Sequence, residues 1–149
     1  MVRPLSSDDD WEARARLSQQ LYPQTDEAVF MAFARGKNDQ ERSLVAQGVG
    51  QRFGAFVADE LVSTAGIFTT HAGIARYQSV ETHHDHRRQG LASAVVHAAG
   101  EHALTTYVVE TLVIAAETDG DAIGIYRRLG FADVERHNTL ERRPGGWDS

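Results

Sequence analysis

The sequence contains no cysteine among its 149 residues. A disulfide framework, a thiolate metal site and a cysteine nucleophile are therefore excluded. The sequence also has no apolar run long enough to cross a bilayer, and Met1-Val2-Arg3-Pro4 lacks the apolar core of a secretion signal. We expect a cytoplasmic protein with no membrane partner.

Positive charge is also scarce, with 15 basic against 21 acidic residues and a net charge of −6. This balance argues against a nucleic-acid partner, because such proteins bind mainly by neutralising phosphates. The 149 residues suit one domain with a substantial core, so we expect residues 1–149 to form a single domain.

The N-terminal third predicts a short strand followed by helices. Residues 2–5 form the expected strand, and Ser7 with three acidic residues after it is typical of a helix start. A second helix is expected over 26–35. Gly36-Lys37-Asn38-Asp39 then predicts a break before a further helical segment over 41–47.

The middle of the chain changes to a β pattern. Residues 53–58 and 61–68 are rich in apolar and β-branched side chains, and Asp59-Glu60 between them predicts a tight turn. We expect an antiparallel hairpin, followed by another strand over 74–82.

The C-terminal part alternates helix and strand. Apolar residues recur at helical spacing from Leu91 for about four turns, and the mostly apolar 108–116 predicts a strand in the middle of a sheet. Residues 123–129 fill a last helix that Gly130 closes, and 132–141 predict a final strand.

The hexapeptide Arg87-Arg88-Gln89-Gly90-Leu91-Ala92 lies between a predicted strand and a predicted helix. Gly90 has no Cβ, so the backbone there can approach a ligand closely. Unpaired N–H groups at the helix start, the helix dipole and two arginines favour a diphosphate site. An ordinary strand-to-helix turn with a basic surface is the alternative, and these six residues do not decide between them.

Two segments in this order resemble the GNAT superfamily of N-acetyltransferases. The first matches its acyl-CoA signature, Gln or Arg, two residues, Gly, one residue, Gly or Ala, with Arg87, Gly90 and Ala92 at the fixed places. In the second, a short helix carrying Tyr126 runs into Gly-Phe at 130–131. The resemblance is specific over about 76–131 and only architectural over 1–70.

The resemblance implies an α/β (α+β) fold, a single GNAT-like domain. A mixed, twisted central sheet of about six or seven strands would be flanked by helices and split between the fourth and fifth strands. Acetyl-CoA would lie in that split as co-substrate, with no metal. The implied cofactor-binding residues are Val80, Thr82, Arg87, Arg88, Gln89, Gly90, Leu91, Ala92 and Ser93.

The resemblance also suggests catalytic residues. Tyr126 matches the tyrosine that protonates the departing CoA thiolate in many of these enzymes, although a tyrosine packed in the core is the alternative. Glu81 is the candidate base that deprotonates the amine, with a solvated or salt-bridged surface glutamate as the alternative. Strand alternation groups Glu81 with Tyr77 and Ser79 on one face.

His83, His84 and His86 surround Asp85 just before the hexapeptide. Adjacent residues in a loop converge poorly on one tetrahedral ion, so we expect a surface near the cofactor phosphates and no metal site. A histidine there could assist proton transfer at neutral pH. His71 and His137 have no stronger interpretation than surface positions.

We therefore expect an N-acetyltransferase that moves an acetyl group directly from acetyl-CoA to a primary amine in a ternary complex. The acceptor is a small-molecule or peptide amine that the sequence does not identify. The alternative is a non-catalytic acyl-CoA-binding sensor or interaction domain. Only Arg142 to Ser149 follow the strand expected after Phe131, so we expect that either the acceptor wall is short or a second subunit of a homodimer completes it.

Overall fold

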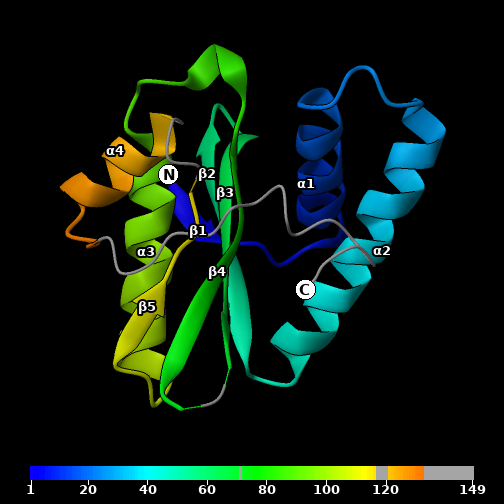
Figure 1. Ribbon diagram of the computed structural model, residues 1–149. Helices are drawn as coiled ribbons and strands as arrows, with labels where there is room; N and C mark the ends of the chain where they lie inside the picture. The colour runs from blue at the N-terminus through cyan, green and yellow to red at the C-terminus, as the bar shows by residue number, and fades with distance from the viewer. Residues whose placement is uncertain (71, 117–120, 133–149) are drawn as a thin grey trace, which may run out of the picture.

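The computed structural model describes residues 1–70, 72–116 and 121–132, and its centre is one mixed sheet (Figure 1). Five strands follow the chain order: β1 (Val2–Pro4), β2 (Gly50–Val57), β3 (Glu60–Thr69), β4 (Ile74–Thr82) and β5 (Thr111–Val113). The first four are antiparallel and β5 runs parallel to β4. The mixed sheet is confirmed, with five strands described in place of the expected six or seven. Apart from Ala132, the expected strand over 132–141 lies outside the described residues.

Helices cover both faces of the sheet (Figure 1). On one face lie α1 (Asp8–Gln20) and α2 (Glu27–Ala46), and on the other lie α3 (Leu91–Thr106) and α4 (Asp121–Arg128). A single 3-10 turn, His84–His86, precedes α3. None of the described helices combines the length and apolar character needed to span a bilayer.

Helix α1 begins as expected at Ser7. The Ser7 hydroxyl accepts a hydrogen bond of 3.1 Å from the backbone N–H of Asp10, and the Asp10 carboxylate accepts one from the N–H of Ser7. This reciprocal arrangement is a capping box. Arg3 of β1 also donates to both oxygens of Asp10, at 2.7 and 3.0 Å, so the cap ties the first strand to the first helix.

The predicted break over 36–39 is wrong, because α2 runs without interruption through Gly36. Packing against α1 explains the difference. The buried Asn38 side chain donates to the backbone oxygen of Trp11 at 2.7 Å and accepts from Arg14 at 2.7 Å. These contacts hold the residues after Gly36 in the helix and override their weak helical propensity.

The hairpin is confirmed, with its turn one residue earlier than predicted. Ala58 and Asp59 have φ angles of 51° and 66°, as a tight two-residue hairpin turn requires. The end of α4 is also as predicted. The N–H of Phe131 donates to the oxygen of Tyr126, the N–H of Gly130 donates to that of Arg127, and Gly130 has a φ of 103°.

The fifth strand is shorter than the predicted 108–116. Its three residues pair with only the first three residues of β4, Ile74–Arg76. From Tyr77 to Thr82, β4 therefore has no partner on β5 in the described part of the chain.

The two faces of the sheet differ in chemistry. The face toward α3 carries the main apolar core, in which β2, β3 and β4 pack against Val95, Val96, Ala99 and Ala103. On the other face, beneath α1 and α2, Arg14, Glu41 and Arg52 are buried together. A charged network thus lies beside the sheet on the α1 and α2 side.

Candidate functional site

The turn that leads into α3 has the backbone shape of an anion cradle. Arg88 and Gly90 have φ angles of 65° and 76°, and both lie in the left-handed region. Gly90 immediately precedes α3, and the first turn of that helix contains no acidic residue. Its free N–H groups and the positive end of its dipole are therefore left for a bound anion.

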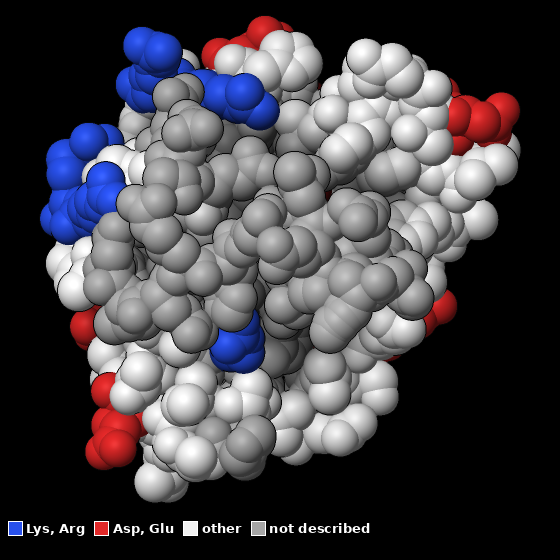
Figure 2. Space-filling view, in the orientation of Figure 1, with Lys and Arg blue, Asp and Glu red and all other residues white. Residues whose placement is uncertain are grey.

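Basic side chains gather around this turn. Figure 2 shows most of the visible Lys and Arg atoms on one side of the face, over the loop before α3 and over α4. These elements contribute Arg87 and Arg88, and Arg127 and Arg128, respectively. Arg87 also donates from Nε to the backbone oxygen of Thr82 at 3.4 Å, which ties the turn to the end of β4. An otherwise acidic protein thus has a local surface that attracts anions.

Strand β4 contains a bulge just before this turn. Gln78 pairs with Gly66 and Glu81 with Thr64, so Ser79 and Val80 together stand opposite one residue of β3. Ser79 has a φ of 48°, in the left-handed region. The sheet is irregular at the position where the sequence suggests that an acyl group binds.

The bulge corrects the predicted side-chain alternation. Tyr77 faces α3, where its hydroxyl donates to the oxygen of Val96 at 2.7 Å. Glu81 faces the other side, where Oε1 accepts a hydrogen bond of 2.6 Å from the Ser18 hydroxyl of α1. The grouping of Glu81 with Tyr77 is therefore wrong, because the extra residue in the bulge reverses the alternation.

The other expected cofactor-binding residues lie along the same path. Val80 is half-buried against the α3 core, and the Thr82 hydroxyl is 2.8 Å from that of Ser63. Leu91, Ala92 and Ser93 form the first turn of α3. Two runs of the sequence, 80–82 and 87–93, thus meet at the end of β4.

Tyr126 is buried in α4, with its ring edge against Phe131 at a centroid distance of 6.3 Å. Burial raises the pKa of its phenol, so the hydroxyl stays protonated at neutral pH. Its hydroxyl has no hydrogen-bond partner among the described residues, whereas that of Tyr77 is held by Val96. Tyr126 can therefore still donate its proton.

Sequence reasoning missed the buried network around Arg52. This side chain is fully buried, and it donates to the two carboxylate oxygens of Glu41 at 2.6 and 2.9 Å. It also donates to the Thr64 hydroxyl and to the backbone oxygens of Gln78 and Ser79. Burial acts to raise the pKa of Glu41, but Arg52 and then Arg14 hold it below its usual value.

A signal for this network was present in the sequence. Arg52 and Gly66 are paired across β2 and β3, and a Cβ at Gly66 would lie 2.6 Å from Nη2 of Arg52. An arginine in a strand opposite a glycine therefore indicates a long side chain laid across the face of the sheet.

The histidine loop brings possible ligand atoms together. Atoms of His83, His84 and Asp85 lie within 4.8 Å of one another. However, Nδ1 of His83 already accepts a hydrogen bond from the N–H of Asp85 at 3.1 Å, and His84 and Asp85 are exposed. His71 and His137 lie outside the described residues.

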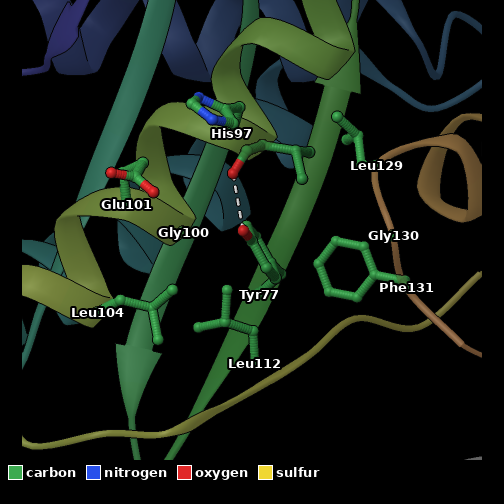
Figure 3. A pocket seen from close by; sticks show the side chains of 10 residues that line it. Tyr77, His97, Gly100, Glu101, Leu104, Leu112, Leu129, Gly130 and Phe131 are labelled. Atoms are coloured by element: carbon green, nitrogen blue, oxygen red, sulfur yellow. Dashed lines mark hydrogen bonds between the residues drawn. The ribbon is translucent and has the colours of Figure 1, made fainter.

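A separate pocket of about 370 Å³ lies between α3 and the turn after α4 (Figure 3). Tyr77, Leu112 and Phe131 form its apolar part, and His97 and Glu101 lie on the α3 side (Figure 3). Its lining contains no residue of the 80–93 segment, so it is distinct from the cradle.

Comparisons with known proteins agree with this geometry. The profile of the acetyltransferase (GNAT) domain matches residues 47–133, more than half of the chain. A comparison with curated protein sequences finds no match.

Solved structures share the fold at low sequence identity. Glucosamine-6-phosphate N-acetyltransferase from Arabidopsis thaliana has a TM-score of 0.70 at 11% identity, covering 92% of this chain and 94% of that one. AAC(6')-Iy in complex with the bisubstrate analogue CoA-S-monomethyl-acetylneamine has a TM-score of 0.69 at 14% identity, covering 92% and 93%. Ribosomal-protein-alanine N-acetyltransferase from Brucella melitensis biovar Abortus 2308 has a TM-score of 0.65 at 19% identity, covering 92% and 95%. The family profile and the shared fold confirm that the chain belongs to the GNAT acetyltransferase family.

Proposed function

We propose that the protein transfers the acetyl group of acetyl-CoA to a primary amine. One observation carries this proposal: the bulged end of β4, at Ser79, leads into the turn before α3. In that turn Arg88 and Gly90 have left-handed φ angles and form the anion cradle. The bulge suits a thioester, and the cradle suits a pyrophosphate. Family membership supports the same activity.

In this proposal the cofactor spans both parts. The N–H groups of 87–93 bind the pyrophosphate, aided by the α3 dipole and the nearby arginines. Pantetheine lies along β4 after Arg76, where β5 no longer pairs, and bonds to the backbone of Val80 and Thr82. The sheet would thus be split between β4 and β5 by its own cofactor.

The transfer itself needs three proton movements: the acceptor nitrogen loses two protons, and the CoA sulfur gains one. Glu81 accepts a proton from the acceptor ammonium, and the freed lone pair attacks the thioester carbonyl carbon. The Val80 N–H stabilises the oxyanion of the tetrahedral intermediate. The attacking nitrogen then loses its second proton to solvent, the carbon–sulfur bond breaks, and Tyr126 protonates the departing CoA thiolate. No acyl-enzyme forms.

In this proposal the acceptor binds between α1 and the end of β4, which the hydrogen bond between Ser18 and Glu81 supports. The acceptor class stays open, because the named structural relatives act on a sugar phosphate and a ribosomal-protein alanine at comparable TM-scores. A small-molecule or peptide amine fits the proposal. The proposal also includes a homodimer in which the second subunit completes the acceptor wall.

The test measures CoA binding and turnover separately. Calorimetric titration should give saturable CoA binding, and thiol release from acetyl-CoA should accelerate with at least one member of an amine panel. A Gly90→Val variant is the control, because a β-branched side chain is strongly disfavoured at the left-handed φ of 76° and should weaken both signals.

The outcomes separate the alternatives. Absence of CoA binding would overturn both the enzyme and the sensor. Tight CoA binding without turnover on any amine would favour the non-catalytic sensor.

A further inference from the structure

Arg52 connects three elements of the fold from a fully buried position. Its guanidinium donates to Glu41 of α2, to the Thr64 hydroxyl of β3, and to two backbone oxygens of β4. The two backbone contacts, to Gln78 at 2.9 Å and Ser79 at 3.1 Å, lie at the bulge. The hydrogen-bond partners of the Arg52 guanidinium therefore come from groups on the α2 side of the sheet and from the bulge itself.

The two carbonyl contacts reveal what Arg52 does to the strand. In a regular strand successive carbonyls point toward opposite edges, so one guanidinium cannot reach both in the same way. Here both carbonyls turn toward one side chain, and Ser79 between them adopts a φ of 48°. A residue with a Cβ, such as serine, disfavours this conformation, so a stabilising contact must offset its cost in free energy.

Glu41 keeps that contact strong. It accepts two hydrogen bonds from Arg52, and its pKa is held low by this partner in spite of burial, so the pair stays ionised. Charge-assisted hydrogen bonds in a buried site are stronger than neutral ones. The chain of contacts runs from α2 through Arg52 to the bulge.

We propose that Arg52 is a positioning residue, anchored by Glu41, that holds the β4 bulge in the shape required for acyl transfer. Its catalytic consequence rests on the proposed function, because the Val80 N–H within the bulge is the group assigned to the thioester. Its structural consequence does not: without Arg52, Ser79 should return to an ordinary strand conformation.

Arg14 provides a matched control. It is also buried and also contacts Glu41, at 3.4 Å, but its other partner is Asn38 and it makes no hydrogen bond to β4. Arg14→Lys and Arg52→Lys therefore disturb the same network while only the second removes contacts to the bulge.

Crystal structures of both variants give the first measurement. We expect Ser79 to lose its left-handed conformation in Arg52→Lys and to keep it in Arg14→Lys. Faster hydrogen exchange of amides 78–82 in Arg52→Lys alone should accompany this change. An unchanged Ser79 and unchanged exchange in Arg52→Lys would overturn the proposal, whatever the protein's activity.

Kinetics give the second measurement. In Arg52→Lys, kcat should fall at least tenfold while the Kd for CoA rises by a smaller factor, because the pyrophosphate contacts of the cradle remain. Adding Ser79→Gly should restore much of the lost kcat, because glycine adopts positive φ without an anchor. Equal kcat losses in the two lysine variants, or no rescue by Ser79→Gly, would show that Arg52 has only a general structural role.

A second variant and a second outcome cover the cases in which Arg52→Lys does not fold or the parent is inactive. If Arg52→Lys does not fold, Glu41→Gln/Arg52→Gln removes both charges together and should show the same change at Ser79. If the parent binds CoA but releases no thiol with any amine, the proposed function fails. The conformation of Ser79 then still decides whether Arg52 holds the bulge.

Discussion

The Ser18 hydroxyl donates a hydrogen bond of 2.6 Å to Oε1 of Glu81, which joins α1 to the end of β4. Glu81→Gln preserves the shape of this contact but removes the ability to take up a proton. If Glu81 is the base, kcat/KM should fall about 100-fold below the pKa of the acceptor amine. The pH–rate profile measures this, and a profile identical to that of the parent would exclude the role. Ser18→Ala, which keeps the carboxylate, should cost much less.

Tyr126 provides the complementary prediction. Tyr126→Phe removes only the hydroxyl, which has no hydrogen-bond partner among the described residues, so folding should be little changed. Loss of the acid should lower kcat about 100-fold, with the largest effect on poor thiol leaving groups. Because burial raises the phenol pKa, kcat in the parent should not decline through this group below about pH 10. Single-turnover rates check this. The control is Tyr107→Phe, which removes a hydroxyl at the C-terminal end of α3, 3.2 Å from Nε2 of His102.

Arg88 combines a favourable charge with an unfavourable backbone conformation. Its φ of 65° predicts that Arg88→Gly is more stable to unfolding than Arg88→Ala by about 1 kcal/mol, because only the alanine keeps the left-handed penalty. Both variants lose the same cation, so both should bind CoA more weakly. Equal denaturation midpoints for the two would contradict the strained backbone.

Gly36 is exposed in the middle of the continuous α2, where a Cβ would meet nothing within 4 Å. Gly36→Ala should therefore raise the free energy of unfolding by about 1 kcal/mol, with a rise of a few degrees in Tm. Gly130→Ala is the matched control, and we expect it to lower the free energy of unfolding. It also meets no neighbour, but its φ of 103° makes alanine destabilising. A loss of stability in Gly36→Ala would contradict a continuous helix.

Asp10 gives a prediction for pH. Hydrogen bonds from Arg3 hold the pKa of Asp10 well below its usual value, against an opposing effect of burial. Its contribution to stability is thus complete above the unfolded pKa of about 4 and is lost as the pH falls further. Asp10→Asn should cost about 1 to 2 kcal/mol at pH 7, and the difference from the parent should shrink in acid. Asp9→Asn, an exposed change in the same turn, should be nearly neutral at both pH values.

Much of the site was accessible from local sequence. Gly130 after α4 adopts the positive φ expected of a C′ glycine, Gly90 lies directly before α3 as expected, and Ser7 caps α1. Each of these features depends on a few neighbouring residues, which is why a motif can predict it. The roles assigned to Tyr126 and Glu81 remain predictions.

Long-range contacts defeated the same reasoning elsewhere. The expected break in α2 failed because Asn38 is held by Trp11, 27 residues away in the sequence. The alternation along β4 failed because one extra residue reverses the faces after Ser79. A bulge of this kind depends on partners in other elements, so the pattern of β4 alone does not reveal it.

The sequence by itself determined the family, the start of α1 at Ser7 and the end of α4 at Gly130, and it predicted a phosphate-binding turn at Arg87 to Ala92. Those features arise from backbone preferences of single residues and from hydrogen bonds within one turn. Only the tertiary structure decided that Glu81 meets Ser18, 63 residues away, and that Arg52 reaches the carbonyls of the bulge. The physical reason is that buried polar groups must find partners wherever the fold brings them, and those partners are not neighbours in the chain.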